Sequence, residues 1–242
     1  MTDSLLPTGI PDLDGLLGGF RIGDNVILQA QVGTPPQAFV RAFLTEALRR
    51  GDRAFFVSFD HSPATVLQSL EGLPAGDFTL VDCFTHGKGR SEDVFVRFYE
   101  RAHPPGVRVV RVEMPQHPSQ FHEAFDRLTR GDSRDCIVVD SLTGMAELWR
   151  SEDRVREFYT HTCPRLFDTR ALAIWVAAEA VHSEAFRAHV GHIAQVVLRL
   201  DRRGAETTLL VERAVGRNNP GTYTLHKYEE LEGGRLRLTP KR

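Results

Sequence analysis

The stretch VILQAQVGTPPQAFVRAFLTEALRR, residues 26–50, decides the fold class. It opens on a short, β-branched apolar run at residues 26–28, which predicts a strand buried on both faces. Over residues 38–50 the apolar side chains recur at helical spacing, and Arg49 and Arg50 close the last turn. A buried strand that leads through a short turn into an amphipathic helix is typical of α/β proteins with a parallel sheet.

The same alternation continues along the chain. Apolar runs predict further strands at residues 54–59, 78–81, 107–112, 136–139 and 171–177. Amphipathic stretches predict helices at residues 62–70, 92–101, 118–130 and 154–168. Strands that alternate with helices imply a sheet covered on both faces, so we expect a three-layer αβα fold with a mostly parallel central sheet.

The pattern changes after residue 190. Short strand-like runs cover residues 196–200, 207–211, 223–226 and 236–238, and Arg203-Gly204 and Gly233-Gly234 have the composition of hairpin turns. We therefore expect an antiparallel β extension over about residues 193–238, at one edge of the sheet. No linker interrupts the chain, so we expect residues 1–242 to form a single domain with its core at about residues 7–200.

Composition limits the classes of function. The 242 residues are 41% hydrophobic and 26% charged, with a formal net charge of -2, so no basic excess attracts nucleic acid or a membrane surface. No apolar run reaches the length of a membrane span, and the first residues do not resemble a secretory signal. The cysteines are 3 in number and widely spaced, which indicates a reduced, cytoplasmic setting.

Four segments carry a resemblance to a known family. They read PTGIPDLDGLLGGF at residues 7–20, FVSFD at 56–60, IVVDSLTG at 137–144 and RAVGRNNPG at 213–221. In this order and spacing they resemble KaiC-like domains of the RecA superfamily of P-loop ATPases, over roughly residues 7–238. The resemblance implies a RecA-like fold, ATP and magnesium as ligands, and assembly into rings with ATP between subunits.

The resemblance also implies roles for acids at two strand ends. Asp60 matches one of two adjacent catalytic carboxylates, and His61 stands where the other belongs. Asp140 takes the Walker B position, which coordinates magnesium indirectly, and Ser141 follows it beside the nucleotide. A simpler interpretation of Asp140 stays open, in which the acid ends a strand and caps the next turn.

The segment at residues 213–221 resembles the stretch that faces the neighbouring subunit's nucleotide. Arg213 matches the family's lysine, but Val215 stands where its arginine belongs. Arg217 supplies another candidate cation. An ATP-dependent contact between subunits is therefore expected to be weak.

The phosphate-binding loop departs most from the family. The pattern G-x-x-x-x-G-K-[ST] falls on Ala30, Gln31, Val32, Gly33, Thr34, Pro35, Pro36 and Gln37. Gly33 and Thr34 keep family residues. The other changes are Ala30 and Pro35 for glycines, Pro36 for the lysine, and Gln37 for the hydroxyl that binds magnesium.

These changes remove the groups that hold phosphate, which are backbone N–H groups, a lysine and a metal-bound hydroxyl. Proline has no N–H to donate. Hydrogen bonds to charged groups are worth about 1.5–3 kcal/mol each, so losing three implies roughly 5–9 kcal/mol, or at least about a thousandfold in affinity. We expect the loop and both acids to be vestigial, with no cofactor bound.

The loop has a local interpretation as well. Thr34 and Gln37 form the pattern T-x-x-Q with prolines between, which predicts a capping box. In it Thr34 accepts the N–H of Gln37, whose side chain returns to the N–H of Thr34. A weak anion site at the helix start stays open.

Three functions compete. The first is a catalytically inactive KaiC-like homologue that acts in signalling or assembly through an unidentified protein partner, as a monomer or a homo-oligomer. The second is a slow ATPase that uses Asp60 and Asp140. The third is a DNA-binding recombination mediator, which the neutral charge balance disfavours. The spacing of His182, His189 and His192 does not match a metal site, and none is expected.

Overall fold

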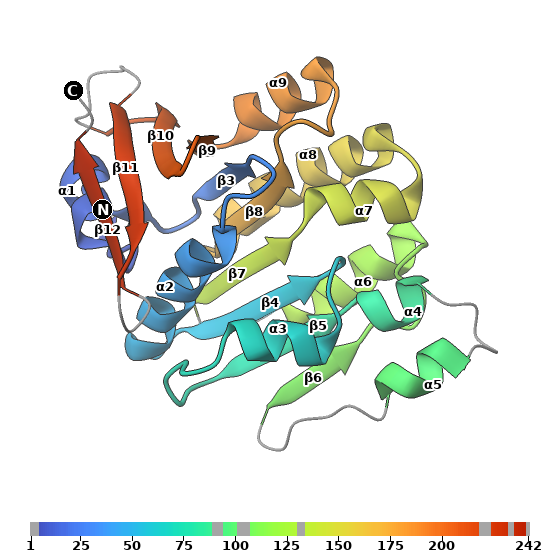
Figure 1. The fold of residues 1–242 in the computed structure, drawn as a ribbon. Coiled ribbons are helices and arrows are strands. Elements are labelled where there is room, and N and C mark those ends of the chain that lie inside the picture. The colour runs from blue at the N-terminus through green and yellow to red at the C-terminus, as the bar shows by residue number, and fades with distance from the viewer. Residues whose placement is uncertain are drawn as a thin grey trace.

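A ten-stranded sheet crosses the whole molecule (Figure 1). The computed structural model describes residues 5–88, 94–100, 107–129, 134–217, 224–231 and 235–240. The strand order is β12-β11-β10-β9-β3-β8-β7-β4-β5-β6. The strands are β3 (Asn25–Ala30), β4 (Arg53–Ser58), β5 (Phe78–Asp82), β6 (Arg108–Arg111), β7 (Asp135–Asp140), β8 (Leu172–Ala178), β9 (Val196–Arg203), β10 (Glu206–Ala214), β11 (Thr224–Glu230) and β12 (Leu236–Pro240).

Strands β9 through β6 pair in parallel, as predicted. The helices are α1 (Pro11–Leu17), α2 (Pro36–Arg49), α3 (Pro63–Ser69), α4 (Phe84–Lys88), α5 (Val94–Glu100), α6 (Pro118–Leu128), α7 (Leu142–Trp149), α8 (Glu152–Asp168) and α9 (Glu184–Ile193). A short antiparallel pair, β1 (Leu5–Leu6) and β2 (Phe20–Arg21), flanks α1. The parallel strands alternate with helices along the chain, which confirms the α/β class.

The two faces of the sheet bury separate hydrophobic layers. Along β3, Val26 and Leu28 join the layer under α2, whereas Ile27 joins the layer under α8 and α9. Successive side chains of a strand point to opposite faces, so a fully apolar strand must be covered on both. Trp149 and Trp175 lie together in the second layer, as expected for buried residues. The three-layer αβα prediction is confirmed.

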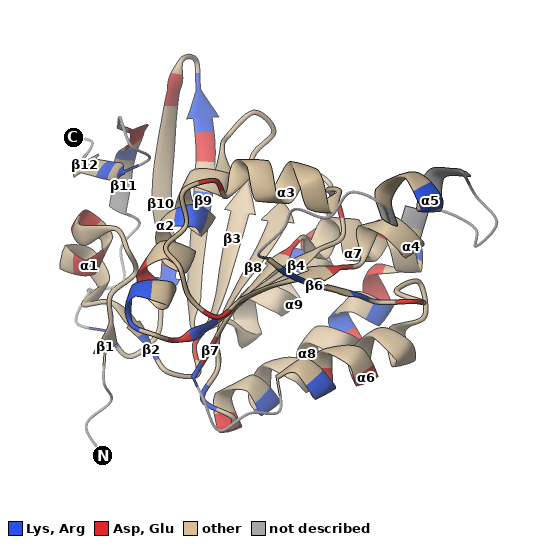
Figure 2. Ribbon diagram, turned by 90° about the horizontal axis from the view of Figure 1, so that it is seen from below, with Lys and Arg blue, Asp and Glu red and all other residues tan. Residues whose placement is uncertain are grey.

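The C-terminal strands extend the same sheet in antiparallel fashion. β9, β10, β11 and β12 pair in sequence order, and Gly204 makes the turn between β9 and β10 at φ +64°. Figure 2 shows the β9–β10 hairpin projecting beyond the rest of the sheet. This confirms the predicted β extension and the Arg203-Gly204 turn, while Gly233-Gly234 lies outside the described residues.

None of the helices in the described ranges combines the length and the apolar character needed to cross a bilayer.

Candidate functional site

The loop at residues 31–35 joins β3 to α2 and folds back on itself. Thr34 donates its backbone N–H to the Gln31 carbonyl at 3.0 Å and its hydroxyl to the same oxygen at 2.7 Å. Gly33 takes φ +85°, a conformation that side chains with a Cβ rarely adopt. The loop is therefore a tight turn whose first carbonyl is satisfied locally.

The predicted capping box is wrong. Helix α2 begins one residue later than that interpretation requires, with Pro35 as N-cap and Pro36 as the first helical residue. No side chain caps the helix. The hydroxyl of Thr34 bonds to the Gln31 carbonyl instead, because Pro36 fixes the helix start and leaves Thr34 outside it.

The β9–β10 hairpin holds the loop from the side. Arg202 donates its backbone N–H to Gln31 Oε1 at 2.6 Å and its Nη1 to the Gly33 carbonyl at 2.9 Å. The hydroxyl of Tyr228, on β11, donates to the Pro35 carbonyl at 3.2 Å. Sequence reasoning missed these contacts, since they join residues more than 160 positions apart.

The two acids meet at one end of the sheet. β4 and β7 are parallel neighbours with Ser58 opposite Asp140, which brings Asp60 beside the end of β7. Ser141 Oγ donates to Asp60 Oδ2 at 2.6 Å, and the peptide between Asp140 and Ser141 is cis. A Cβ on residue 144 would lie 2.1 Å from Asp60 Oδ1, so the glycine there makes room for this carboxylate.

The capping interpretation of Asp140 is also wrong. β7 ends at Asp140, but Ser141 is the N-cap of α7 and accepts the Gly144 N–H at 3.0 Å. Asp140 is 9% exposed. Burial, with a second contribution from the charge of Asp60, raises the pKa of Asp140 to about 7. This carboxyl is therefore partly protonated at neutral pH.

Asp140 faces the start of α2 across very little space. Together with Pro36 and Gln37 it lines a hollow of about 10 Å³. That volume corresponds to roughly one water molecule. The arrangement places a proton-holding acid beside a helix start that lacks an ammonium and a hydroxyl.

The segment that resembles an intersubunit contact is engaged within its own chain. The side chain of Arg217 is 1% exposed, forms an ion pair with Asp24 and donates Nε to the Gly19 carbonyl at 3.2 Å. Asp24 precedes β3, at the end of the strand opposite the loop. Its burial outweighs the arginine and raises the pKa of Asp24. These contacts argue against Arg217 as a cation for a neighbour's ligand.

Arg213 and the rest of that segment add little to the site. Arg213 is half-buried on β10 opposite Val197, at an irregularity in the strand pairing. The Asn219-Pro220-Gly221 part of the resemblance lies outside the described residues.

The histidines take hydrogen bonds rather than cluster. His182 bonds through Nδ1 to Glu152 Oε1 and through Nε2 to Thr143 Oγ1, each at 2.8 Å. His189 Nε2 bonds to Thr160 Oγ1 at 2.9 Å. Within the described ranges no three His, Cys, Asp or Glu side chains are arranged to hold a metal ion. The Glu152–His182–Thr143 chain was missed, because no local pattern links its members.

The sheet order, the loop after β3 and the acids after β4 and β7 define a RecA-type P-loop NTPase fold. A model of the KaiC ATPase family matches residues 6–216. The chain therefore belongs to the KaiC family of ATPase domains. The resemblance seen in the sequence is confirmed at the level of family and fold.

Named relatives agree with this placement. A UPF0273 protein of Pyrococcus furiosus is 28% identical over 145 residues, which cover 56% of this chain and 53% of that protein. The circadian clock protein KaiC3 of a Synechocystis species is 32% identical over 68 residues, 28% of this chain and 14% of that protein. The chain thus spans about half the length, or less, of these curated relatives.

A solved structure shows the same fold. The crystal structure of a KaiC-like protein from Pyrococcus horikoshii superposes with a TM-score of 0.69 at 16% identity, covering 98% of this chain and 100% of that one. At that identity the likeness concerns the fold alone.

Proposed function

We propose that this KaiC-like domain has lost normal ATP binding and hydrolysis and works in signalling or assembly through protein–protein contacts. The observation that carries the proposal is the start of α2, where Pro35 and Pro36 stand in place of phosphate-binding N–H groups and a lysine.

Electrostatics at the site support the loss of ATP binding. A triphosphate seated against α2 would meet the carboxyls of Asp60 and Asp140 without the lysine or the magnesium-binding hydroxyl that normally offset its charge. Arg202 lies beside the loop, but its guanidinium donates to the Gly33 and Gly204 carbonyls.

Surface character supports a protein partner at the same end of the sheet. Val32, in the loop after β3, is 80% exposed, and Val181, in the loop after β8, is 59% exposed. These loops follow neighbouring strands, joined by the bond from Glu179 N to the Ala30 carbonyl at 3.0 Å. A contiguous apolar patch that such side chains help to form favours contact with another protein. Two relatives named as circadian clock proteins are consistent with a signalling role.

Calorimetry with ATP and magnesium tests the proposal on the whole chain. We expect no saturable heat up to about 1 mM nucleotide, since the lost contacts correspond to at least about a thousandfold in affinity. Binding at about 10 μM or tighter would contradict the proposal.

A slow ATPase is the second candidate, and the pKa of Asp140 favours it. A carboxyl with a pKa of about 7 suits proton transfer at neutral pH. This candidate requires phosphate release that disappears in Asp140→Ala. We expect equal, background release from both proteins, and a turnover that depends on Asp140 would establish the enzyme instead.

A further inference from the structure

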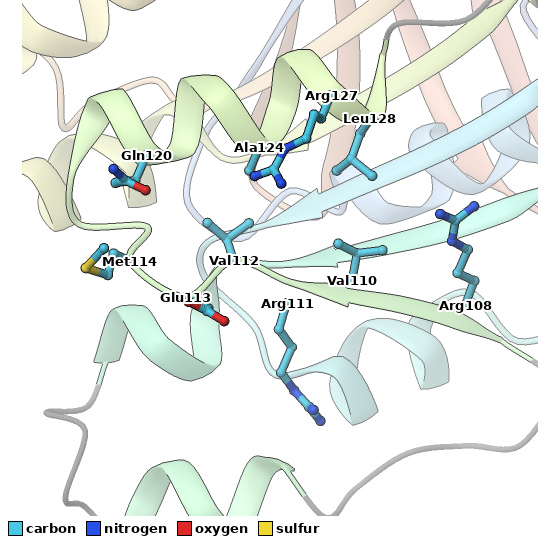
Figure 3. A pocket seen from close by; sticks show the side chains of 10 residues that line it. All are labelled: Arg108, Val110, Arg111, Val112, Glu113, Met114, Gln120, Ala124, Arg127 and Leu128. Atoms are coloured by element: carbon cyan, nitrogen blue, oxygen red, sulfur yellow. The ribbon is translucent and has the colours of Figure 1, made fainter.

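A groove of about 520 Å³ lies between β6 and α6, at the far edge of the sheet from the C-terminal strands (Figure 3). Its volume falls within the range of small-molecule sites. Strands β8, β7, β4 and β5 separate it from the loop after β3. The groove is therefore a second candidate site, and what it binds does not depend on whether that loop holds a nucleotide.

The walls of the groove are apolar. Val110 on β6 and Val112 just after it lie on the same face, because side chains two positions apart in a strand share a face. Val112 is buried in the hydrophobic layer under α6, whereas Val110 is only half-buried. Ala124 and Leu128 line the facing side of α6, and the short side chain of Ala124 leaves the space over Val110 open. A hydrocarbon group seated in that space would complete the burial of Val110.

Two arginines lie at one end of the groove. Arg108 begins β6 and Arg127 lies in the last turn of α6, and Figure 3 shows them near each other. Both are exposed, and among the residues that the structure describes no carboxylate forms an ion pair with either. The helix dipole favours a cation at Arg127 but does not account for Arg108. Arg111 points away from α6, and Glu113 lies toward the other end (Figure 3). The end formed by Arg108 and Arg127 is therefore positive.

The combination of a positive end and apolar walls selects the chemistry of a ligand. Guanidinium groups bind carboxylates through charge-assisted hydrogen bonds, and apolar walls bind a hydrocarbon body. We propose that the groove binds a small amphipathic carboxylate. Its carboxylate lies between Arg108 and Arg127, and its hydrocarbon body packs against Val110, Ala124 and Leu128.

Calorimetric titration of the whole chain with sodium decanoate tests the proposal. We expect saturable binding. Acetate lacks the hydrocarbon body and decyltrimethylammonium reverses the charge, so each should bind at least about tenfold more weakly. From hexanoate to decanoate the affinity should rise roughly fourfold for each added methylene, as burial of one CH₂ predicts. A lack of saturable decanoate binding up to about 10 mM would overturn the proposal.

Charge reversal at the positive end tests the role of the arginines. R108E/R127E should bind decanoate about tenfold or more weakly than the parent protein. The matched control R49E/R154E changes exposed arginines on α2 and α8 and should bind as the parent does. Thermal unfolding checks the fold of both variants. Equal decanoate affinity in R108E/R127E and the parent would show that these arginines do not hold the carboxylate, and the proposal would be wrong.

Filling the groove separates a built site from simple attraction to a basic surface. Ala124→Phe leaves every charge in place but occupies the space over Val110. It should weaken decanoate about tenfold or more and abolish the dependence of affinity on chain length. Val110→Phe fills the same space from the opposite wall and replaces Ala124→Phe if that variant does not fold. Unchanged decanoate affinity in a folded, filled variant would place the hydrocarbon body elsewhere and contradict the proposal.

Discussion

The loop after β3 and the strand ends of β4 and β7 lie at the same end of the sheet, yet they differ in what they offer a nucleotide. At the strand ends, Asp60, Asp140 and Ser141 keep the polar groups that the family resemblance assigns. In the loop, Pro35 and Pro36 replace such groups. One half of the site is therefore polar and acidic, whereas in the other half Pro35 and Pro36 supply neither a backbone N–H nor an ammonium.

The difference shows which side chains are supported without a ligand. Asp60 accepts the Ser141 hydroxyl, and Ser141 caps α7, so these groups have partners within the chain. A P-loop lysine finds its partner in the phosphate. The loop here is stabilised by other means, namely Thr34 and Arg202 bonded to its own carbonyls.

The largest expected effect comes from rebuilding the loop. The variant A30G/P35G/P36K/Q37T restores the family pattern and should bind ATP with magnesium in the micromolar range, a gain of at least about a thousandfold. The reason is that an ammonium, a hydroxyl and backbone donors return opposite Asp140. Calorimetry at fixed magnesium measures this gain.

The control for the rebuilt loop is A30G/P35G. It frees the backbone but supplies no cation and no magnesium ligand, so little affinity should return. If the quadruple variant is folded but gives no binding heat with ATP, something other than the loop residues blocks ATP.

The next largest effect is expected at the acids that follow β4 and β7. It concerns the stability of the protein rather than ligand binding. Folding raises the pKa of Asp140 from 3.8 to about 7, so the folded state holds a proton that the unfolded chain releases. The free energy of unfolding therefore falls as pH rises from about 4 to about 7, by up to about 4 kcal/mol. Asp140→Asn keeps the neutral form and should match the parent near pH 4 but exceed its stability at pH 8. Urea unfolding at both pH values measures the gap.

The control for that prediction is Asp60→Asn, which removes the charge that helps to raise the pKa of Asp140. In this background the stabilising effect of Asp140→Asn at pH 8 should shrink without vanishing, since burial is the larger cause. If the free energies of unfolding of Asp140→Asn and its parent differ by the same amount at both pH values, the raised pKa of Asp140 is contradicted.

The smallest expected effect concerns the hydrogen bond from Arg202 on the β9–β10 hairpin to the loop after β3. Arg202→Ala removes the bond to the Gly33 carbonyl and should cost only about 0.5–1.5 kcal/mol, because the arginine is exposed. Exchange of the backbone amide hydrogens at residues 31–34 should nevertheless become faster. Arg203→Ala, on the same hairpin, is the matched control. Equal exchange in both variants would show that the hairpin does not hold the loop.

The sequence predicted the sheet well, because its strands are continuous apolar runs buried on both faces. Shorter helices were missed for physical reasons. Only Ser141 separates helix α7 from the end of β7 at Asp140, so no loop marks the start of this helix. Helix α1 spans only 7 residues, too few for a helical period to stand out.

The sequence predicted which strand ends carry the two acids, but it did not predict the contacts around them. Asp60 and Asp140 were placed by position after strands that proved to be neighbours. The capping box failed because the helix begins at Pro36, which leaves Thr34 outside it, with its hydroxyl donated to the Gln31 carbonyl. The ion pair of Arg217 with Asp24 joins distant segments, and only the folded chain reveals it.

Both tryptophans of the chain, Trp149 and Trp175, lie in the hydrophobic layer under α6 to α9. Trp175 packs edge-on to Phe158 and Tyr159, and Trp149 packs against Phe121. Intrinsic fluorescence excited near the red edge of protein absorption will therefore report the order of this layer alone. Loosening of the α1–α2 side of the sheet needs another optical probe, such as a fluorophore attached there.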